Sequence, residues 1–220
     1  MPKKYDWYKL LDKSWYVTKI VFGLAIICLL AYGYGTFKPN KWAKDKVNDD
    51  VENFYLKKIA DLDLREPEFM YNNDIQFVRA LHKCIDYINF TTPRMNRVPF
   101  EMIIGQAALE TGWGTSRFAT EGNNLFGIRT WNLKEKHIKP FDTNDQTFGI
   151  KVFNSKCSCV RYYIQILNNA SAFKEFRKMR KKMIDNNYVN VLSLTQYISK
   201  FATDKDYVKK VQRTIKELRK

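Results

Sequence analysis

The sequence predicts a mainly α-helical protein with one small β-hairpin and an apolar helix near its N-terminus. Three observations support this fold class. Residues 20–37 contain no charged side chain, apolar residues recur at helical spacing through most of 75–218, and Phe148, Ile150 and Val152 alternate with other residues as in a strand. The 220 residues leave room for one domain of ordinary size and an additional segment.

The N-terminal segment is predicted to anchor the chain in a membrane. Residues 1–14 form a basic tail, and residues 15–37 contain the uncharged run, which is long enough to span the hydrocarbon core of a bilayer. A cleavable signal peptide is the rival interpretation, but the apolar run is longer than a usual signal core. Five lysines precede the run and four follow it, which leaves the orientation undecided. Interface-seeking aromatic residues stand at both ends of the run: Trp15, Tyr16, Tyr32 and Tyr34.

Residues 38–75 are highly charged and predict a stalk with helical periodicity near 51–61. A helix is then expected over 75–88, and a second begins with Pro99 in its first position and ends at Gly112. Residues 135–141 are expected to pair with the strand around 148–152. Further helices are predicted over 156–169, 171–184 and 191–201. A last helix uses Asp204 as its N-cap and buries one stripe of side chains: Tyr207, Val208, Val211, Ile215 and Leu218.

Glu110 is the leading candidate for a catalytic residue. It lies in the last turn of the helix that ends at Gly112, near the negative end of the helix dipole, and Trp113 beside it would exclude water. Both effects favour the neutral acid and predict a raised pKa, which a general acid needs near neutral pH. The alternative is a solvated glutamate on a helix end.

The segment after Glu110 has the composition expected of a carbohydrate-binding cleft. Glycines allow close approach of the backbone to a ligand, and aromatic rings offer flat faces to sugars. Asparagine amides can both donate to and accept from hydroxyl or acetamido groups. The candidates for substrate contacts here are Trp113, Asn123, Asn124 and Phe126.

The run AALETGWGTSRFATEGNNLFGI, residues 107–128, resembles the signature of the bacterial glucosaminidase family, glycoside hydrolase family 73, and its Bax-like branch. Residues 151–180 and 201–215 resemble later parts of the family's pattern, so the similarity covers roughly 76–220. The resemblance implies a lysozyme-like catalytic domain over 76–220 that cleaves peptidoglycan glycan strands next to N-acetylglucosamine. It assigns the catalytic acid to Glu110.

Two positions depart from a complete catalytic pattern. The family's C-terminal motif usually opens with Tyr, but this chain has Phe201, with Tyr197 and Tyr207 as candidates to replace its hydroxyl. The second carboxylate is not evident, and Asp142 is the first choice among Glu121, Glu135, Asp142 and Asp145. The substrate's N-acetyl group, or the 6-hydroxyl of muramic acid in a lytic transglycosylase, could act instead of a carboxylate. A binding module that keeps the fold without the chemistry is the alternative from another class.

The formal net charge of +15 includes basic runs in 174–182 and 209–220, which are either solvated helix faces or surfaces attracted to anionic polymers. A nucleic acid partner is not expected, because no recognition motif accompanies this charge. Cys84 could pair with Cys157 or Cys159 in an oxidising compartment. With only two histidines, no metal and no cofactor are expected. The expected location is the bacterial inner membrane, with the catalytic domain outside the cytoplasm. The oligomeric state is not predicted.

Overall fold

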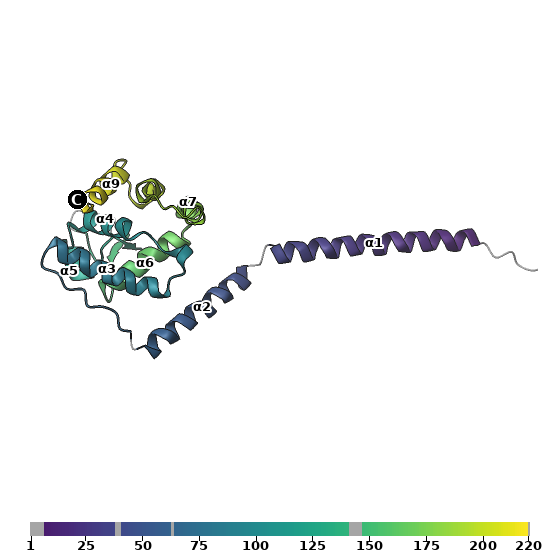
Figure 1. The fold of residues 1–220 in the computed structure, drawn as a ribbon, viewed down its shortest axis with the longest axis horizontal. Helices are drawn as coiled ribbons and strands as arrows, with labels where there is room; N and C mark the ends of the chain where they lie inside the picture. The colour runs from purple at the N-terminus through teal and green to yellow at the C-terminus, as the bar shows by residue number, and fades with distance from the viewer. Residues whose placement is uncertain (1–6, 38–40, 63, 141–146, 220) are drawn as a thin grey trace, which may run out of the picture. The chain divides into compact units, whose positions relative to one another are not determined.

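The computed structural model describes residues 7–37, 41–62, 64–140 and 147–219. These residues are mostly helical, and they divide into two compact units, residues 1–54 and 55–220 (Figure 1). The α-helices are α1 (Trp7–Phe37), α2 (Lys41–Asp61), α3 (Asp74–Thr91), α4 (Phe100–Thr111), α5 (Arg117–Gly122), α6 (Lys156–Asn169), α7 (Lys174–Asp185), α8 (Val191–Leu194) and α9 (Tyr207–Leu218). Short 3-10 helices are η1 (Arg94–Asn96), η2 (Ser171–Phe173) and η3 (Thr195–Phe201).

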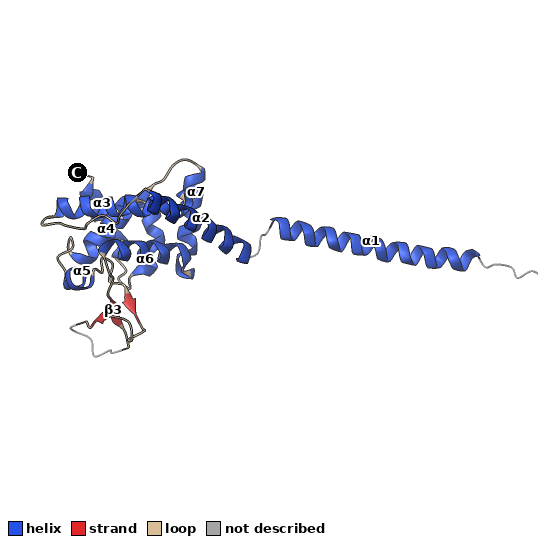
Figure 2. Ribbon diagram, turned by 90° about the horizontal axis from the view of Figure 1, so that it is seen from below, coloured by secondary structure: helices blue, strands red, loops and turns tan. Residues whose placement is uncertain are grey.

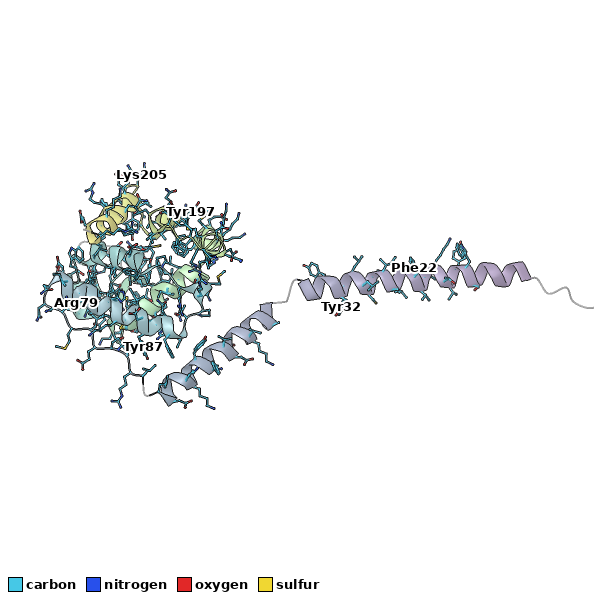
Figure 3. All side chains as sticks on the ribbon, in the orientation of Figure 1. Phe22, Tyr32, Arg79, Tyr87, Tyr197 and Lys205 are labelled. Atoms are coloured by element: carbon cyan, nitrogen blue, oxygen red, sulfur yellow. A yellow bond between two sulfur atoms is a disulfide. The ribbon has the colours of Figure 1, made fainter. Side chains whose placement is uncertain are left out.

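Helix α1 contains the predicted apolar segment. Its stretch Ser14–Gly35 is long and apolar enough to cross a membrane, a property that anchors and signal sequences share. The side chains of this stretch are not buried against other parts of the protein, and Figure 3 shows Phe22 and Tyr32 projecting outward from the helix. The helix begins at Trp7, so it includes part of the segment predicted as a tail.

The predicted stalk contains two kinds of structure. Helix α2 starts at Lys41 and is therefore longer than the periodicity over 51–61 indicated. Nearer to α3, the Phe69 and Tyr71 rings pack edge-on against Phe77, and the Tyr71 hydroxyl donates to the Gly114 carbonyl at 2.7 Å. The packed domain thus includes residues that precede position 76.

Helix α4 packs against both α3 and α9 in the C-terminal unit, and α6 packs against α3 (Figure 1). Met102, Ile103, Ala107 and Ala108 are all buried, as their spacing predicted. A Cβ at Gly105 would lie 2.7 Å from Ile215 Cγ1, so glycine at this position allows α9 to approach closely.

The sheet contains three short antiparallel strands, β1 (Arg129–Thr130), β2 (His137–Ile138) and β3 (Gly149–Lys151), in the order β1-β3-β2. Ile150 pairs with Arg129 on one side and with Ile138 on the other. Figure 2 shows the sheet in red beside the helical body. The pairing of β2 with β3 confirms the predicted hairpin, whereas β1 was missed because two residues are too few to show alternation.

Several predicted helix boundaries differ from the structure: α3 continues to Thr91, and residues 171–173 form the 3-10 helix η2 ahead of α7. Pro99 precedes α4 as its cap residue and is not its first helical residue. The segment 191–201 is not a single helix, because α8 gives way to the 3-10 helix η3 at Thr195. Asp204 is not the N-cap of α9: it forms a turn in which its carboxylate accepts from the Asp206 N–H at 2.8 Å, and α9 begins after Asp206.

A disulfide between Cys84 and Cys157 connects α3 to the first turn of α6, whereas Cys159 remains a buried thiol. We expect the double variant Cys84→Ser/Cys157→Ser to lose about 2–5 kcal/mol of unfolding free energy, because the cross-link constrains the unfolded chain. Urea unfolding of the wild type with and without reductant measures the same loss without introducing buried hydroxyls. Cys28→Ser, which changes an exposed free thiol, is the control. An unfolding midpoint that does not respond to reductant would contradict the prediction.

Candidate active site

Glu110 lies at the end of α4, where Gly112 caps the helix in the left-handed conformation with φ 54° and donates its N–H to the Ala108 carbonyl. The Glu110 side chain is partly buried. Burial raises the pKa of this carboxyl above its usual value, and a hydrogen bond from Tyr207 opposes part of that rise. The raised pKa agrees with the direction predicted from the helix end and from exclusion of water by Trp113.

A chain of hydrogen bonds lies behind Glu110. The Tyr163 hydroxyl donates to Gln106 Oε1, and Gln106 Nε2 donates to the Tyr207 hydroxyl at 2.7 Å. Because the Tyr207 hydroxyl accepts from Gln106, its own proton is free to point toward Glu110, whose pKa it lowers. Burial raises the pKa of both Tyr163 and Tyr207 far above the usual value, so both phenols keep their protons. Gln106 and Glu110 share one face of α4 because they are four residues apart.

The backbone of the loop after α5 passes next to the Glu110 carboxyl. Gly127 has φ 61°, and a Cβ added there would lie 3.7 Å from Glu110 Oε2, so the backbone runs directly beside the carboxyl. Asn124 holds this loop from within the core. Its amide donates to the carbonyls of Ile128 and Lys151 at 2.9 and 2.8 Å, and its Oδ1 accepts from the N–H groups of Phe126 and Ile128.

A cleft of about 800 Å³ lies next to Glu110, within the roughly 300–1,000 Å³ of typical ligand sites. Its walls come from the end of α4, the loop that leads into β1, and the connection between η3 and α9. Trp131 at this cleft is 69% exposed, which leaves its ring available to a ligand. The lining residues are Glu110, Phe126, Gly127, Ile128, Arg129, Trp131, Ile166, Ser199, Lys200, Phe201, Ala202, Thr203, Asp204, Lys205 and Val208.

Among the predicted substrate-binding residues, Phe126 and Phe201 line the cleft, and Tyr207 lies directly behind it. Phe201 packs its edge on Tyr163 at 5.5 Å and stacks on Tyr207 at 6.3 Å, so these rings form one aromatic wall. The Phe201 ring carries no hydroxyl, and Tyr207 is the tyrosine whose hydroxyl reaches the acid. Tyr197 packs against the hydrophobic core and is not among the cleft-lining residues.

The other predicted contacts have structural partners. Asn124 is fully buried in the bonds described above, and Asn123 caps α5 while its amide donates to the Phe153 carbonyl at 3.0 Å. Trp113 adopts φ 60° and packs partly buried against the core. None of the three lines the cleft as described, and their contact with substrate stays a prediction.

The candidates for the second carboxylate are not brought to Glu110 by the described structure. Asp142 and Asp145 lie outside the described residues. Glu121 is exposed at the end of α5, and Glu135 accepts from Lys151 Nζ at 2.5 Å. The bond to Lys151 lowers the pKa of Glu135, so this carboxylate is ionised and occupied. Asp142 stays the predicted second acid.

Sequence reasoning missed several residues of the site, namely Gln106, Tyr163, Arg129 and Trp131. Gln106 could have been noticed, since it is a polar residue among apolar ones and stands four positions before Glu110. Its hydrogen bonds to Tyr163 and Tyr207 could not have been predicted, because these residues are 57 and 101 positions away in the chain. In the described residues, no group of three or more histidine, cysteine or acidic side chains could hold a metal ion.

Comparison with known proteins assigns this arrangement to a family. A family model described as mannosyl-glycoprotein endo-beta-N-acetylglucosaminidase, the glucosaminidase family, matches residues 92–220. Protein bax of Escherichia coli (strain K12) is 35% identical over 97 residues, which are 43% of this chain and 33% of that protein. The chain thus spans about a third of the length of this curated relative.

Two solved structures share the fold. The catalytic domain of the autolysin Auto from Listeria monocytogenes aligns with a TM-score of 0.52 and 19% identity, covering 74% of this chain and 94% of that chain. A peptidoglycan hydrolase from Sphingomonas sp. A1 aligns with a TM-score of 0.51 and 21% identity, covering 65% of this chain and 87% of that chain. These likenesses confirm the predicted lysozyme-like fold. Because the family model covers more than half of the chain, the chain belongs to the glucosaminidase family, and its resemblance to the Bax-like branch is confirmed.

Proposed function

We propose that this chain is a membrane-anchored peptidoglycan hydrolase that cleaves glycan strands next to N-acetylglucosamine, with Glu110 as the general acid. Its family makes it a glycoside hydrolase. The observation that supports the proposed role is the position of Glu110: a partly buried carboxyl at an open cleft, whose pKa is raised by burial and lowered in part by the Tyr207 hydroxyl. A carboxyl that keeps its proton near neutral pH can protonate the glycosidic oxygen of the leaving sugar.

Cleavage of the glycosidic bond also needs a nucleophile or a base on the side opposite the acid. We propose Asp142 for this role, since a retaining or inverting glycosidase uses two carboxyl groups on either side of the bond. The N-acetyl group of the substrate is the alternative, because it can attack the anomeric carbon without a second carboxylate. The partly exposed Phe201 ring would pack against the apolar face of a sugar ring, with the buried Phe126 behind the wall of the cleft.

The domain organisation follows from the same proposal. Residues 1–14 would lie in the cytoplasm, and residues 15–37 would cross the inner membrane once. Residues 38–75 would connect the membrane to the domain of 76–220 in the periplasm or wall, with Phe69 and Tyr71 packed onto that domain. The support for anchoring is the apolar stretch of α1. Peptidoglycan lies outside the cytoplasmic membrane, which gives the orientation that the count of lysines left undecided.

Identification of the products tests the proposed reaction. The full chain in detergent is incubated with purified sacculi, and the released fragments are analysed by mass spectrometry. Fragments with reducing N-acetylglucosamine ends are expected. Anhydro-muramic ends would identify a lytic transglycosylase instead, and sacculi that bind the chain but release nothing would identify a binding module.

Trp131 is expected to contribute to substrate affinity through its exposed ring. Trp131→Ala should raise KM for glycan strands about two- to tenfold with a smaller change in kcat, because a stacked ring binds ground state and transition state alike. Kinetics on soluble glycan strands measure this. Leu133→Ala is the control. Leu133 lies in the same β1–β2 connection as Trp131 and is 46% exposed, but it does not line the cleft. An equal rise in KM in both variants would contradict the stacking role.

A further inference from the structure

The cleft beside Glu110 contains three cationic side chains, Arg129, Lys200 and Lys205. They come from two separate segments: Arg129 belongs to β1, whereas Lys200 lies near the end of η3 and Lys205 in the connection that leads from η3 to α9. All three are exposed, and Figure 3 shows Lys205 at the surface beside the start of α9. Several cations therefore meet one ligand-sized space.

These cations have no carboxylate partner within the described ranges of the chain. The Arg129 guanidinium lies over the Phe148 ring, 4.3 Å from its centroid, a contact that leaves its positive charge uncompensated. Exposed lysines elsewhere do have acidic partners, as in the pairs Lys181–Asp185 and Lys209–Asp206. The charge at the cleft thus differs from that of a surface on which neighbouring acids and bases neutralise one another.

The acids of the cleft do not supply the missing negative charge. Glu110 favours its neutral form because burial raises its pKa. Asp204 accepts from Lys210 Nζ at 2.7 Å and from the Asp206 N–H, so its charge is matched by a lysine that is not part of the cleft. The result is a positive potential within a concave site, which attracts an anionic ligand.

Glycan strands of peptidoglycan offer one kind of anion to such a site. Their sugar rings are neutral, but each muramic acid carries a lactyl arm on its 3-oxygen that ends in a carboxyl group. This carboxylate is free on strands without peptides, and on other strands it is amide-linked to a stem peptide with carboxylates of its own. A strand of N-acetylglucosamine alone carries no such group.

We propose that Arg129, Lys200 and Lys205 form a carboxylate subsite that binds the acidic group carried by the lactyl arm of muramic acid. The proposal rests on the proposed function, since it assumes that a glycan strand occupies the cleft. It makes muramic acid, and not only N-acetylglucosamine, part of what the cleft recognises. The subsite would orient the strand relative to Glu110 by placing one sugar type beside the cations.

Binding to three ligands tests the subsite: a neutral N-acetylglucosamine oligomer, glycan strands without peptides, and strands with stem peptides. The full chain carries Glu110→Gln in all samples so that the ligands are not degraded. Lys200→Gln/Lys205→Gln is compared with Lys182→Gln/Lys216→Gln, which removes the same charge from exposed positions of α7 and α9 away from the cleft. Affinities are measured by calorimetry at low and at high salt.

For each protein, the affinity for the carboxylate-bearing strand is divided by the affinity for the neutral oligomer. At low salt, this ratio should be about two- to tenfold smaller for Lys200→Gln/Lys205→Gln than for the chain with Glu110→Gln alone. At high salt, the difference should become smaller because salt screens the charges. A loss of affinity for peptide-free strands identifies the lactyl carboxylate as the bound group. A loss of affinity confined to peptide-bearing strands identifies the carboxylates of the stem peptide as the bound groups. An unchanged ratio, or the same reduction in the control variant, overturns the subsite. Wild-type chain that binds with this selectivity but cleaves no strand would keep the subsite and reject the proposed reaction.

Discussion

Glu110→Gln should reduce the rate of glycan cleavage by a factor of about 100 to 10,000, because the amide cannot give a proton to the leaving oxygen. The change preserves size and leaves a group that can accept the hydrogen bond of Tyr207, so the cleft should keep its shape. The rate of reducing-end release from sacculi by the full chain measures the effect. Glu121→Gln, at an exposed position on α5, controls for the loss of one acid near the same loop. Similar activity in wild type and Glu110→Gln would remove Glu110 from the mechanism.

The same variant also has an expected effect on stability. Because the pKa of Glu110 is raised in the folded chain, its protonated form favours folding. The stability from this preference is fully present below the ordinary pKa of a glutamic acid, and it is lost as the pH rises through the raised value. Glutamine does not ionise, so Glu110→Gln should have a Tm equal to the wild type at acidic pH and a higher Tm at pH 8. A lower Tm for the variant at pH 8 would mean that the fold stabilises the carboxylate, and would contradict the raised pKa.

The position of Glu110 could be predicted because it depends on local features. An apolar run and the glycine at position 112 define where α4 ends, and the carboxyl must then lie in the last turn. For the disulfide, the sequence predicted Cys84 as one partner but did not distinguish between Cys157 and Cys159 as the other. Cys157 and Cys159 differ by about 200° around a helix, so only one of them can face α3, and which one depends on how α6 is rotated in the fold.

The role of Asn124 could not be predicted from its residue type and its position after Glu110. An amide has the same hydrogen-bonding capacity toward a sugar and toward a backbone, so residue type alone did not distinguish the two roles. Burial in the core directs both ends of this amide to backbone groups. The cations of the cleft were missed for a related reason: Arg129 and the two lysines are ordinary surface residues in sequence, and only the fold brings their segments to one cleft.

Tyr207→Phe is expected to lower kcat about tenfold to a hundredfold, because it removes the hydroxyl that lowers the pKa of Glu110 and stabilises its carboxylate after proton transfer. The hydrogen bond lowers the pKa of Glu110, so its loss should raise that pKa further. The acid would then keep its proton to higher pH, and the alkaline limb of the pH profile of kcat/KM should shift to higher pH. Rates on soluble glycan strands across the pH range measure both effects.

A purely structural role of Tyr207 predicts a different result. Removing its hydroxyl leaves Gln106 Nε2 without its partner in the core, which could reduce activity by loosening α9 against α4. Loosening would lower kcat without moving the alkaline limb, and it would lower the Tm in parallel. Tyr188→Phe, at a 67% exposed position, removes a phenol outside the cleft and should change neither quantity. A lower kcat with an unmoved alkaline limb would therefore assign Tyr207 to the scaffold and leave the pKa of Glu110 to burial alone.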